Sequence, residues 1–244
     1  MENQSLPVKV AAVADLHFSR VPQQHLQAVF AEATKSADIL LLCGDLTDTG
    51  LPDEAKNLAR ELNAIVKIPC IGVLGNHDFE SGKQDEVKTI LRESGINILD
   101  GDACEIKGVG FAGAKGFAGG FGPGALQPWG EDVIKLFVRE AVNESLKLET
   151  ALAKLRVERK IAILHYSPSR ATVEGEPPEI LPWLGSNRLE DPFTRYEVNA
   201  VFHGHAHRGQ LHGTTRNNIP VYNVSMSVLQ RTFPDRPPFY LLEI

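Results

Sequence analysis

Five short polar clusters follow apolar runs along the chain, and their side chains are of the kinds that bind divalent cations. In chain order they are Asp15-Leu16-His17, Gly44-Asp45, Gly75-Asn76-His77-Asp78, His165 and Gly204-His205-Ala206-His207. Carboxylate and amide oxygens mixed with imidazole nitrogens suit Mn²⁺, Fe or Zn²⁺ better than Ca²⁺, which prefers oxygen ligands only. A pair of such ions can activate water against a phosphate ester. Each cluster alone is a weak signal, so the prediction depends on their combination.

The apolar runs before these clusters are short and continuous, as is typical of strands buried on both faces. They cover 8–14, 39–43, 70–74, 161–164 and 200–202. A helical pattern follows each of the first three runs, at 26–33, 55–62 and 87–91. This alternation predicts parallel strands joined by right-handed crossovers. Open α/β sheets place their sites at the carboxyl ends of the strands, so we expect every cluster at the same sheet edge.

The pattern changes after about residue 100. Short strands are predicted at 103–106 and 109–112, followed by a glycine-rich segment at 115–130, for which an ordered surface loop is favoured over a lid or partner surface. A helical pattern at 131–159 is one long helix or two with a break near 143–145. Residues 209–244 predict short antiparallel strands with turns at Gly213 and Asn217-Asn218. At 244 residues we predict a single domain over 1–244, with an insertion at about 115–159.

The composition of the chain limits the classes of partner that it can bind and indicates its cellular compartment. A net charge of −6 disfavours duplex nucleic acid and anionic membranes. No apolar run approaches the ~20 residues that span a bilayer, and residues 1–5 show no start of a secretory signal. The three cysteines lack C-x-x-C spacing, and two of them lie in strand-like runs. We therefore predict a cytoplasmic protein without a membrane partner.

With all five clusters in this order, the chain resembles the calcineurin-like metallophosphoesterases. The signature of that family is D-x-H, G-D-x-x-D, G-N-H-D/E, a lone H and G-H-x-H, and here it extends from Asp15 to His207. The chain is also similar to the bacterial subgroup related to cyclic-nucleotide phosphodiesterases. The resemblance implies an α/β fold, a four-layer α/β/β/α sandwich of two mixed sheets flanked by helices.

The resemblance implies a ligand set for two metal ions, Mn, Fe or Zn. One ion would be held by Asp15, His17, Asp45 and His207. The other would be held by Asp45, Asn76, His165 and His205, so that Asp45 bridges the pair. A hydroxide bridging two ions would attack the phosphorus in line.

The resemblance also separates an acid from the ligands. His77 would protonate the leaving group or stabilise its charge. Asp48 matches the family carboxylate that orients this histidine, although a turn or helix cap is the alternative. Asp78 is interpreted as structural. His203 is assigned a structural or supporting role, and the other two histidines, His25 and His212, are placed outside the site.

The substrate is less constrained. Arg208, beside ligand His207, and Arg188, in the long segment after His165, are candidates to bind a phosphate oxygen. Because Thr49-Gly50 follows Asp48 where protein phosphatases have Arg-Gly, we expect a small phosphodiester or phosphomonoester, not a phosphoprotein.

Two alternatives remain: a nuclease, which the net charge disfavours, and a non-catalytic scaffold binding a partner through the loop and long helix. Retention of all seven ligands and His77 argues against the scaffold. The long helix is also compatible with a homo-oligomer.

Overall fold

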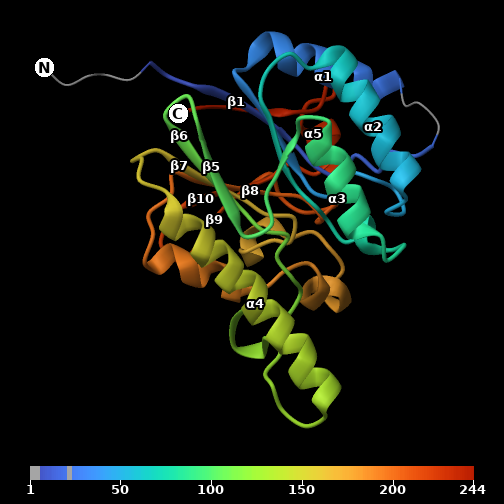
Figure 1. The fold of residues 1–244 in the computed structure, drawn as a ribbon. Helices are drawn as coiled ribbons and strands as arrows, with labels where there is room; N and C mark the ends of the chain where they lie inside the picture. Colours follow the sequence, from blue (N-terminus) through green and yellow to red (C-terminus); the bar gives the residue numbers. More distant parts are fainter. Residues whose placement is uncertain (1–5, 21–23) are drawn as a thin grey trace, which may run out of the picture.

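The protein is built from two mixed β-sheets that face each other, with helices on their outer sides (Figure 1). This computed structural model describes residues 6–20 and 24–244. The predicted fold class is confirmed. Residues 1–5, which the expectation about a secretory signal concerned, lie outside the described part.

The first sheet carries the three N-terminal clusters. Its strands run in the order β11 (Tyr240–Glu243), β1 (Lys9–Val13), β2 (Ile39–Cys43), β3 (Cys70–Val73) and β4 (Asn97–Ile98). Strands β1 to β4 are parallel, and β11 pairs antiparallel with β1. The connecting helices are α1 (Gln24–Ser36), α2 (Pro52–Ile65) and α3 (Gln84–Glu93). The predicted parallel β-helix-β alternation is therefore confirmed in this half.

Helix α2 shows how the sequence fixes an element beside the site. Pro52 occupies its first turn, where a missing N–H costs nothing. The buried Glu54 carboxylate accepts hydrogen bonds from the backbone N–H groups of Thr49 (2.9 Å) and Leu51 (3.2 Å). These bonds satisfy donors that a helix start leaves free. The loop that carries Asp45 and Asp48 is thereby tied to a rigid helix.

The second sheet carries the two remaining clusters. Its order is β5 (Asp102–Ile106), β6 (Val109–Gly113), β7 (Lys160–Ile163), β8 (Ala200–His203), β10 (Pro220–Asn223) and β9 (His212–Thr214). The four central strands are parallel and the two edge strands antiparallel. Helix α4 (Asp132–Lys154) covers the outer face, and its N-terminal end projects beyond the sheet (Figure 1).

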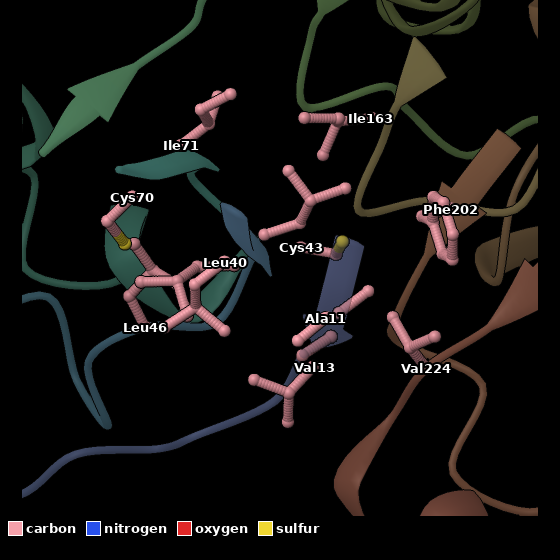
Figure 2. Close-up of a cluster of buried hydrophobic side chains, with 14 of the residues drawn as sticks. Ala11, Val13, Leu40, Cys43, Leu46, Cys70, Ile71, Ile163, Phe202 and Val224 are labelled. Atoms are coloured by element: carbon pink, nitrogen blue, oxygen red, sulfur yellow. The ribbon is translucent and has the colours of Figure 1, made fainter. Parts of the chain in front are cut away.

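The main core lies between the sheets. Figure 2 shows side chains of the first sheet, among them Ala11, Cys43 and Ile71, beside Ile163 and Phe202 of the second, and all belong to one buried cluster. Alternate residues of the second sheet, such as Ala162 and Val201, point the other way and pack in a separate cluster with α4. Burial on both faces explains the continuous apolar runs.

The expectation of a single sheet edge is wrong in one respect. Three clusters follow β1, β2 and β3 of the first sheet, and two follow β7 and β8 of the second. Because the sheets face each other, the carboxyl ends of both sets of strands meet. The site is therefore built between two sheets.

The C-terminal segment differs from the all-antiparallel prediction. Strand β10 pairs parallel with β8, and residues Met226–Thr232 form helix α5. Gly213 lies within β9, whereas the predicted turn at Asn217-Asn218 is confirmed, with Asn218 at φ 60°. The seven residues of α5 are too few for a helical period to stand out.

The pattern at 131–159 resolves into the single helix α4, without a break at 143–145. The segment after His165 contains three short 3₁₀ helices, Arg170–Thr172, Pro178–Trp183 and Asn187–Thr194. Within the described ranges, no helix is both long and apolar enough to cross a membrane.

Candidate metal centre

Six of the seven predicted ligands fall into groups in which one donor atom per residue lies within 4.8 Å of the others. One group is Asp15, His17 and His207, and another is Asp45, His165 and His205. The seventh, Asn76, places its Oδ1 2.9 Å from His165 Nε2. All seven residues therefore come together from five separate strand ends.

The backbone at these positions is left-handed, which explains how ligands two apart can converge. Asp15 (φ 58°), His17 (φ 44°), Asp45 (φ 49°) and His205 (φ 69°) are all in this region. The other non-glycine residues with positive φ in the described ranges, Lys107 and Asn218, lie beside hairpin turns. Such a conformation costs roughly 1–2 kcal/mol for a side-chain-bearing residue. Its concentration at the ligands marks the centre as a functional site.

Glycines allow the strand ends to approach each other closely. A Cβ atom at Gly44 would lie 2.4 Å from His165 Nδ1, and one at Gly75 would lie 2.1 Å from Asp45 Oδ1. A Cβ at Gly204 would lie 2.7 Å from Asp15 Oδ2. The glycine in each of these three motifs is thus required by packing against a ligand.

In the first group, Asp15 is the central carboxylate. His207 Nε2 lies 3.3 Å from its Oδ1, and the backbone N–H of His205 donates to both of its oxygens (3.1 and 3.0 Å). His17 Nε2 lies 4.0 Å from Asp45 Oδ2 and so connects this group to the next. Asp15 is only 4% exposed, whereas the His207 side chain is 43% exposed, so this group borders solvent on the His207 side.

In the second group, His165 is fully buried and held by its neighbours. Its Nδ1–H donates to the carbonyl oxygen of Cys43 (3.1 Å), which directs Nε2 toward Asp45 Oδ1 at 3.3 Å. In the same way, the Nε2–H of His205 donates to the carbonyl oxygen of Trp183 (3.2 Å) and leaves Nδ1 as the donor atom for a cation. Backbone carbonyls commonly fix ligand histidines in this manner.

Charge within the second group is unevenly distributed. Burial alone would lower the pKa of His165, but the adjacent Asp45 carboxylate outweighs it and raises the pKa to about 9. Burial lowers the pKa of His205 to about 3, and that imidazole is neutral at pH 7. A cation binding at His165 would therefore displace a proton.

The donor set fits a pair of hard or borderline cations. Two buried carboxylates, Asp15 and Asp45, are surrounded by imidazoles and one amide oxygen, the combination that Mn²⁺, Fe and Zn²⁺ accept. Asp45 takes part in two of the groups, beside His17 and beside His165. A carboxylate has enough lone pairs to contact two ions.

His77 lies within the same cluster, grouped with His17 and Asp45, and its ring contacts the His17 ring edge-on at 4.5 Å. Its Nδ1–H donates to the backbone carbonyl oxygen of Asp48 (2.8 Å). The Asp48 carboxylate instead lies 3.8 Å from His17 Nδ1. The carboxylate near His77 Nδ1 is that of Glu80, at 3.2 Å.

Sequence reasoning overlooked Glu80, although its position three residues after His77 on one helical turn was the available signal. It also overlooked Tyr166, whose ring lies 4.5 Å from that of His205. The Trp183 carbonyl had no sequence signal, because backbone atoms are not encoded by residue type.

The two arginines lie in different surroundings. Arg208 is exposed beside His207, and its backbone N–H donates to Glu176 Oε1 (2.6 Å). The Arg188 guanidinium donates to the Leu126 carbonyl (3.2 Å) and to Gln127 Oε1 (3.3 Å), so it fastens the glycine-rich loop.

The remaining polar residues of the motifs have structural surroundings. His203 is fully buried between the Gly204 carbonyl and Thr172 Oγ1, both at 2.7 Å, and burial lowers its pKa to about 4. His25 and His212 are exposed and outside the ligand groups. Asp78 is buried and accepts hydrogen bonds from backbone groups on two loops.

A comparison with protein families matches residues 8–209 to the calcineurin-like phosphoesterase model. The matched region includes every one of the five clusters. The chain belongs to the calcineurin-like phosphoesterase family. It is thus a member of a family of metal-dependent phosphoester hydrolases.

Curated relatives of this phosphoesterase include UDP-2,3-diacylglucosamine hydrolases. One from Escherichia fergusonii is 25% identical, and one from Escherichia coli is 27% identical, with 87% of each chain covered in both cases. These relatives differ from the cyclic-nucleotide phosphodiesterase subgroup expected from the sequence.

Solved structures share the fold. Phosphopantetheinyl hydrolase from Mycobacterium tuberculosis superposes with a TM-score of 0.67 at 17% identity, covering 97% of this chain and 95% of that chain. The protein TT1561 of Thermus thermophilus superposes with a TM-score of 0.58 at 15% identity, covering 97% and 99%. At these identities the likeness concerns the architecture, two sheets flanked by helices.

Proposed function

We propose that this phosphoesterase hydrolyses a small phosphodiester or phosphomonoester at a two-metal centre formed by the seven predicted ligands. The observation that carries the proposal is the position of Asp45, whose carboxylate is grouped with His17 on one side and with His165 and His205 on the other. That arrangement suits a bridge between two ions. Two bound cations would supply a nucleophile from water at neutral pH and would screen the charge of the phosphate.

The protein's own residues then have separate tasks. Asp15, His17, Asp45 and His207 would hold one cation, and Asp45, Asn76, His165 and His205 the other. His77 would donate a proton to the leaving oxygen from Nε2, since its Nδ1 is occupied by the Asp48 carbonyl oxygen. Asp48 would orient His77 through this backbone contact, supported by the Glu80 carboxylate 3.2 Å away.

The substrate is proposed only as a class. The names of the similar proteins point to two different substrates, a UDP-linked diacylglucosamine and a phosphopantetheinyl group. Of the two arginines, exposed Arg208 beside ligand His207 is the better candidate to bind a phosphate oxygen. The tether between Arg188 and the glycine-rich loop supports a structural role for that residue instead. A nuclease activity is disfavoured by the net charge of −6.

The test replaces one ligand at a time and measures hydrolysis of bis(p-nitrophenyl) phosphate by metal-free protein reconstituted with Mn²⁺, Fe²⁺ or Zn²⁺. His165→Ala and Asn76→Ala should each lower kcat/KM at least about 100-fold, as expected when a metal ligand is removed. His25→Ala, which changes an exposed histidine on α1, should remain within twofold. Near-wild-type turnover in both ligand variants, with unchanged circular dichroism, would refute the proposal.

A further inference from the structure

Lys115 is a nearly buried ammonium group beside the metal centre. The residue is 9% exposed, and in the described part of the chain no carboxylate forms an ion pair with it. Within that part, Nζ donates one hydrogen bond, to the Gly116 carbonyl (2.8 Å), although an ammonium has three donors. The nearby Glu144 carboxylate is already engaged by the Gly116 N–H (2.8 Å) and by Lys147 Nζ (2.7 Å).

The position of Lys115 connects it to two parts of the centre. Its carbonyl oxygen accepts hydrogen bonds from the backbone N–H groups of His165 (3.0 Å) and Tyr166 (3.1 Å). Its Nζ lies 5.3 Å from the ring of Phe79, which ends the short helix that begins at His77. The backbone of Lys115 is therefore joined to the segment that carries a proposed ligand, while its ammonium lies near Phe79, on the segment that carries the proposed acid.

Aromatic rings surround this cation. Besides Phe79, the rings of Phe117 (4.9 Å) and Tyr166 (5.2 Å) lie near Nζ, and the Tyr166 ring also contacts that of His205 at 4.5 Å. Ring faces attract a cation and so recover part of the cost of burying it. The rest of that cost is normally met by an anion. The carboxylates of Glu144, Glu140 and Asp100 attract this ammonium from a distance, but in the described part of the chain none of them forms an ion pair with it, so a bound anion is the group that would complete the environment.

We propose that Lys115 contacts the substrate at an anionic oxygen beyond the phosphate held by the ligand cluster, which favours substrates with two neighbouring anionic groups such as a diphosphate. This inference rests on the proposed phosphoesterase function. It assigns a substrate-binding role to the start of the glycine-rich segment, which the five clusters do not include.

The test measures binding, so it does not depend on turnover. Methylenediphosphonate, with two phosphonate groups, and methylphosphonate, with one, are titrated calorimetrically into Mn²⁺-loaded protein freed of excess metal. Wild-type protein should bind the diphosphonate at least 10-fold more tightly. Lys115→Met should weaken diphosphonate binding about 10- to 100-fold, the range of one charge-assisted hydrogen bond, and change methylphosphonate binding less than threefold.

Two further variants separate charge from folding. Lys115→Gln removes the charge but keeps a donor for the Gly116 carbonyl, and it should show the same selective loss. Lys135→Met removes an exposed lysine that pairs with Asp132 at 3.1 Å on α4, and it should bind both probes as wild type does. Metal content after each titration checks that the diphosphonate has not removed the ions.

Equal weakening of both probes in the Lys115 variants, or no preference for the diphosphonate in the wild type, would overturn the inference. Failure of the wild type to hydrolyse any phosphoester would count against the proposed function instead. The two results are distinguishable, because probe binding and turnover are measured separately.

Discussion

At the scale of single residues, Gly44 shows how tightly the centre is built. It has φ +88°, and a Cβ there would lie 2.4 Å from Nδ1 of the buried ligand His165. Gly95 has nearly the same φ, +91°, but a Cβ at that position would point into open space, with nothing within 4 Å. A comparison of substitutions at these two glycines therefore distinguishes the destabilisation caused by a left-handed backbone from that caused by displacing a ligand.

We predict that Gly95→Ala lowers the free energy of unfolding by about 1 kcal/mol, from backbone strain alone. Gly44→Ala should cost about 3 kcal/mol or more, because the overlap with the His165 ring adds to the strain. It should also reduce phosphodiester hydrolysis at least about 100-fold, because a ligand displaced by even 1 Å loses its geometry. Urea unfolding and steady-state kinetics measure both effects. Equal stability losses in the two variants, with activity retained, would contradict this account.

The ligand types could be predicted from the sequence because a metal centre requires particular atoms, and these are encoded by residue identity. The roles of supporting groups could not. The contact between Asp48 and His77 runs through a backbone carbonyl, and Glu80 supplies the nearby carboxylate. The left-handed backbone conformation of Asp15 and Asp45 could not be predicted either, because aspartate adopts other conformations as well and its presence does not indicate this one.

At the scale of elements, Asp78 joins the loop after β2 to the loop after β3. Its carboxylate accepts hydrogen bonds from the backbone N–H groups of Leu46 (3.2 Å), Thr47 (2.8 Å) and Gly75 (2.7 Å), and from the Thr47 hydroxyl (2.6 Å). These two loops carry Asp45 and Asn76. Asp78 therefore holds two ligand-bearing elements in register.

We predict that Asp78→Ala lowers the free energy of unfolding by about 3 kcal/mol or more, because several buried donors lose their acceptor. The measurement is urea unfolding in the presence of a chelator, so that metal binding does not contribute. Asp235→Ala, at an exposed aspartate, serves as the control and should change stability by less than about 0.5 kcal/mol. A loss below about 1 kcal/mol in Asp78→Ala would show that the two loops are held by other contacts.

Elements with a clear hydrophobic periodicity could be predicted from the sequence. Features that depend on tertiary contacts could not. The polar residues near 143–145 left open a break in the long helix. In the structure Glu144 is buried and accepts the Gly116 N–H, while Ser145 Oγ donates to the Arg188 carbonyl (2.8 Å). Glu144 and Ser145 are polar because α4 packs on loops whose backbone groups need hydrogen-bond partners from the helix. A helical pattern alone does not reveal such contacts.

At the scale of the whole molecule, the centre depends on two sheets facing each other. Periodicity predicted the strands and the polar groups at their carboxyl ends, but assigned them to one edge. The division into two sheets came only from the family resemblance, because pairing between distant strands leaves no local pattern in a sequence. We propose that the 244 residues act as a single domain, since the ligands come from both sheets.

The most direct test of the two-metal centre is the number of cations bound per chain. Metal-free protein is reconstituted with Mn²⁺, freed of excess ion and measured by mass spectrometry of the metal. The account predicts two ions per wild-type chain and at most one in Asp45→Ala, because that variant lacks the carboxylate that we propose as the bridge between the two ions. A fully active wild-type protein with one ion or none, or an Asp45→Ala variant that retains two, would contradict it.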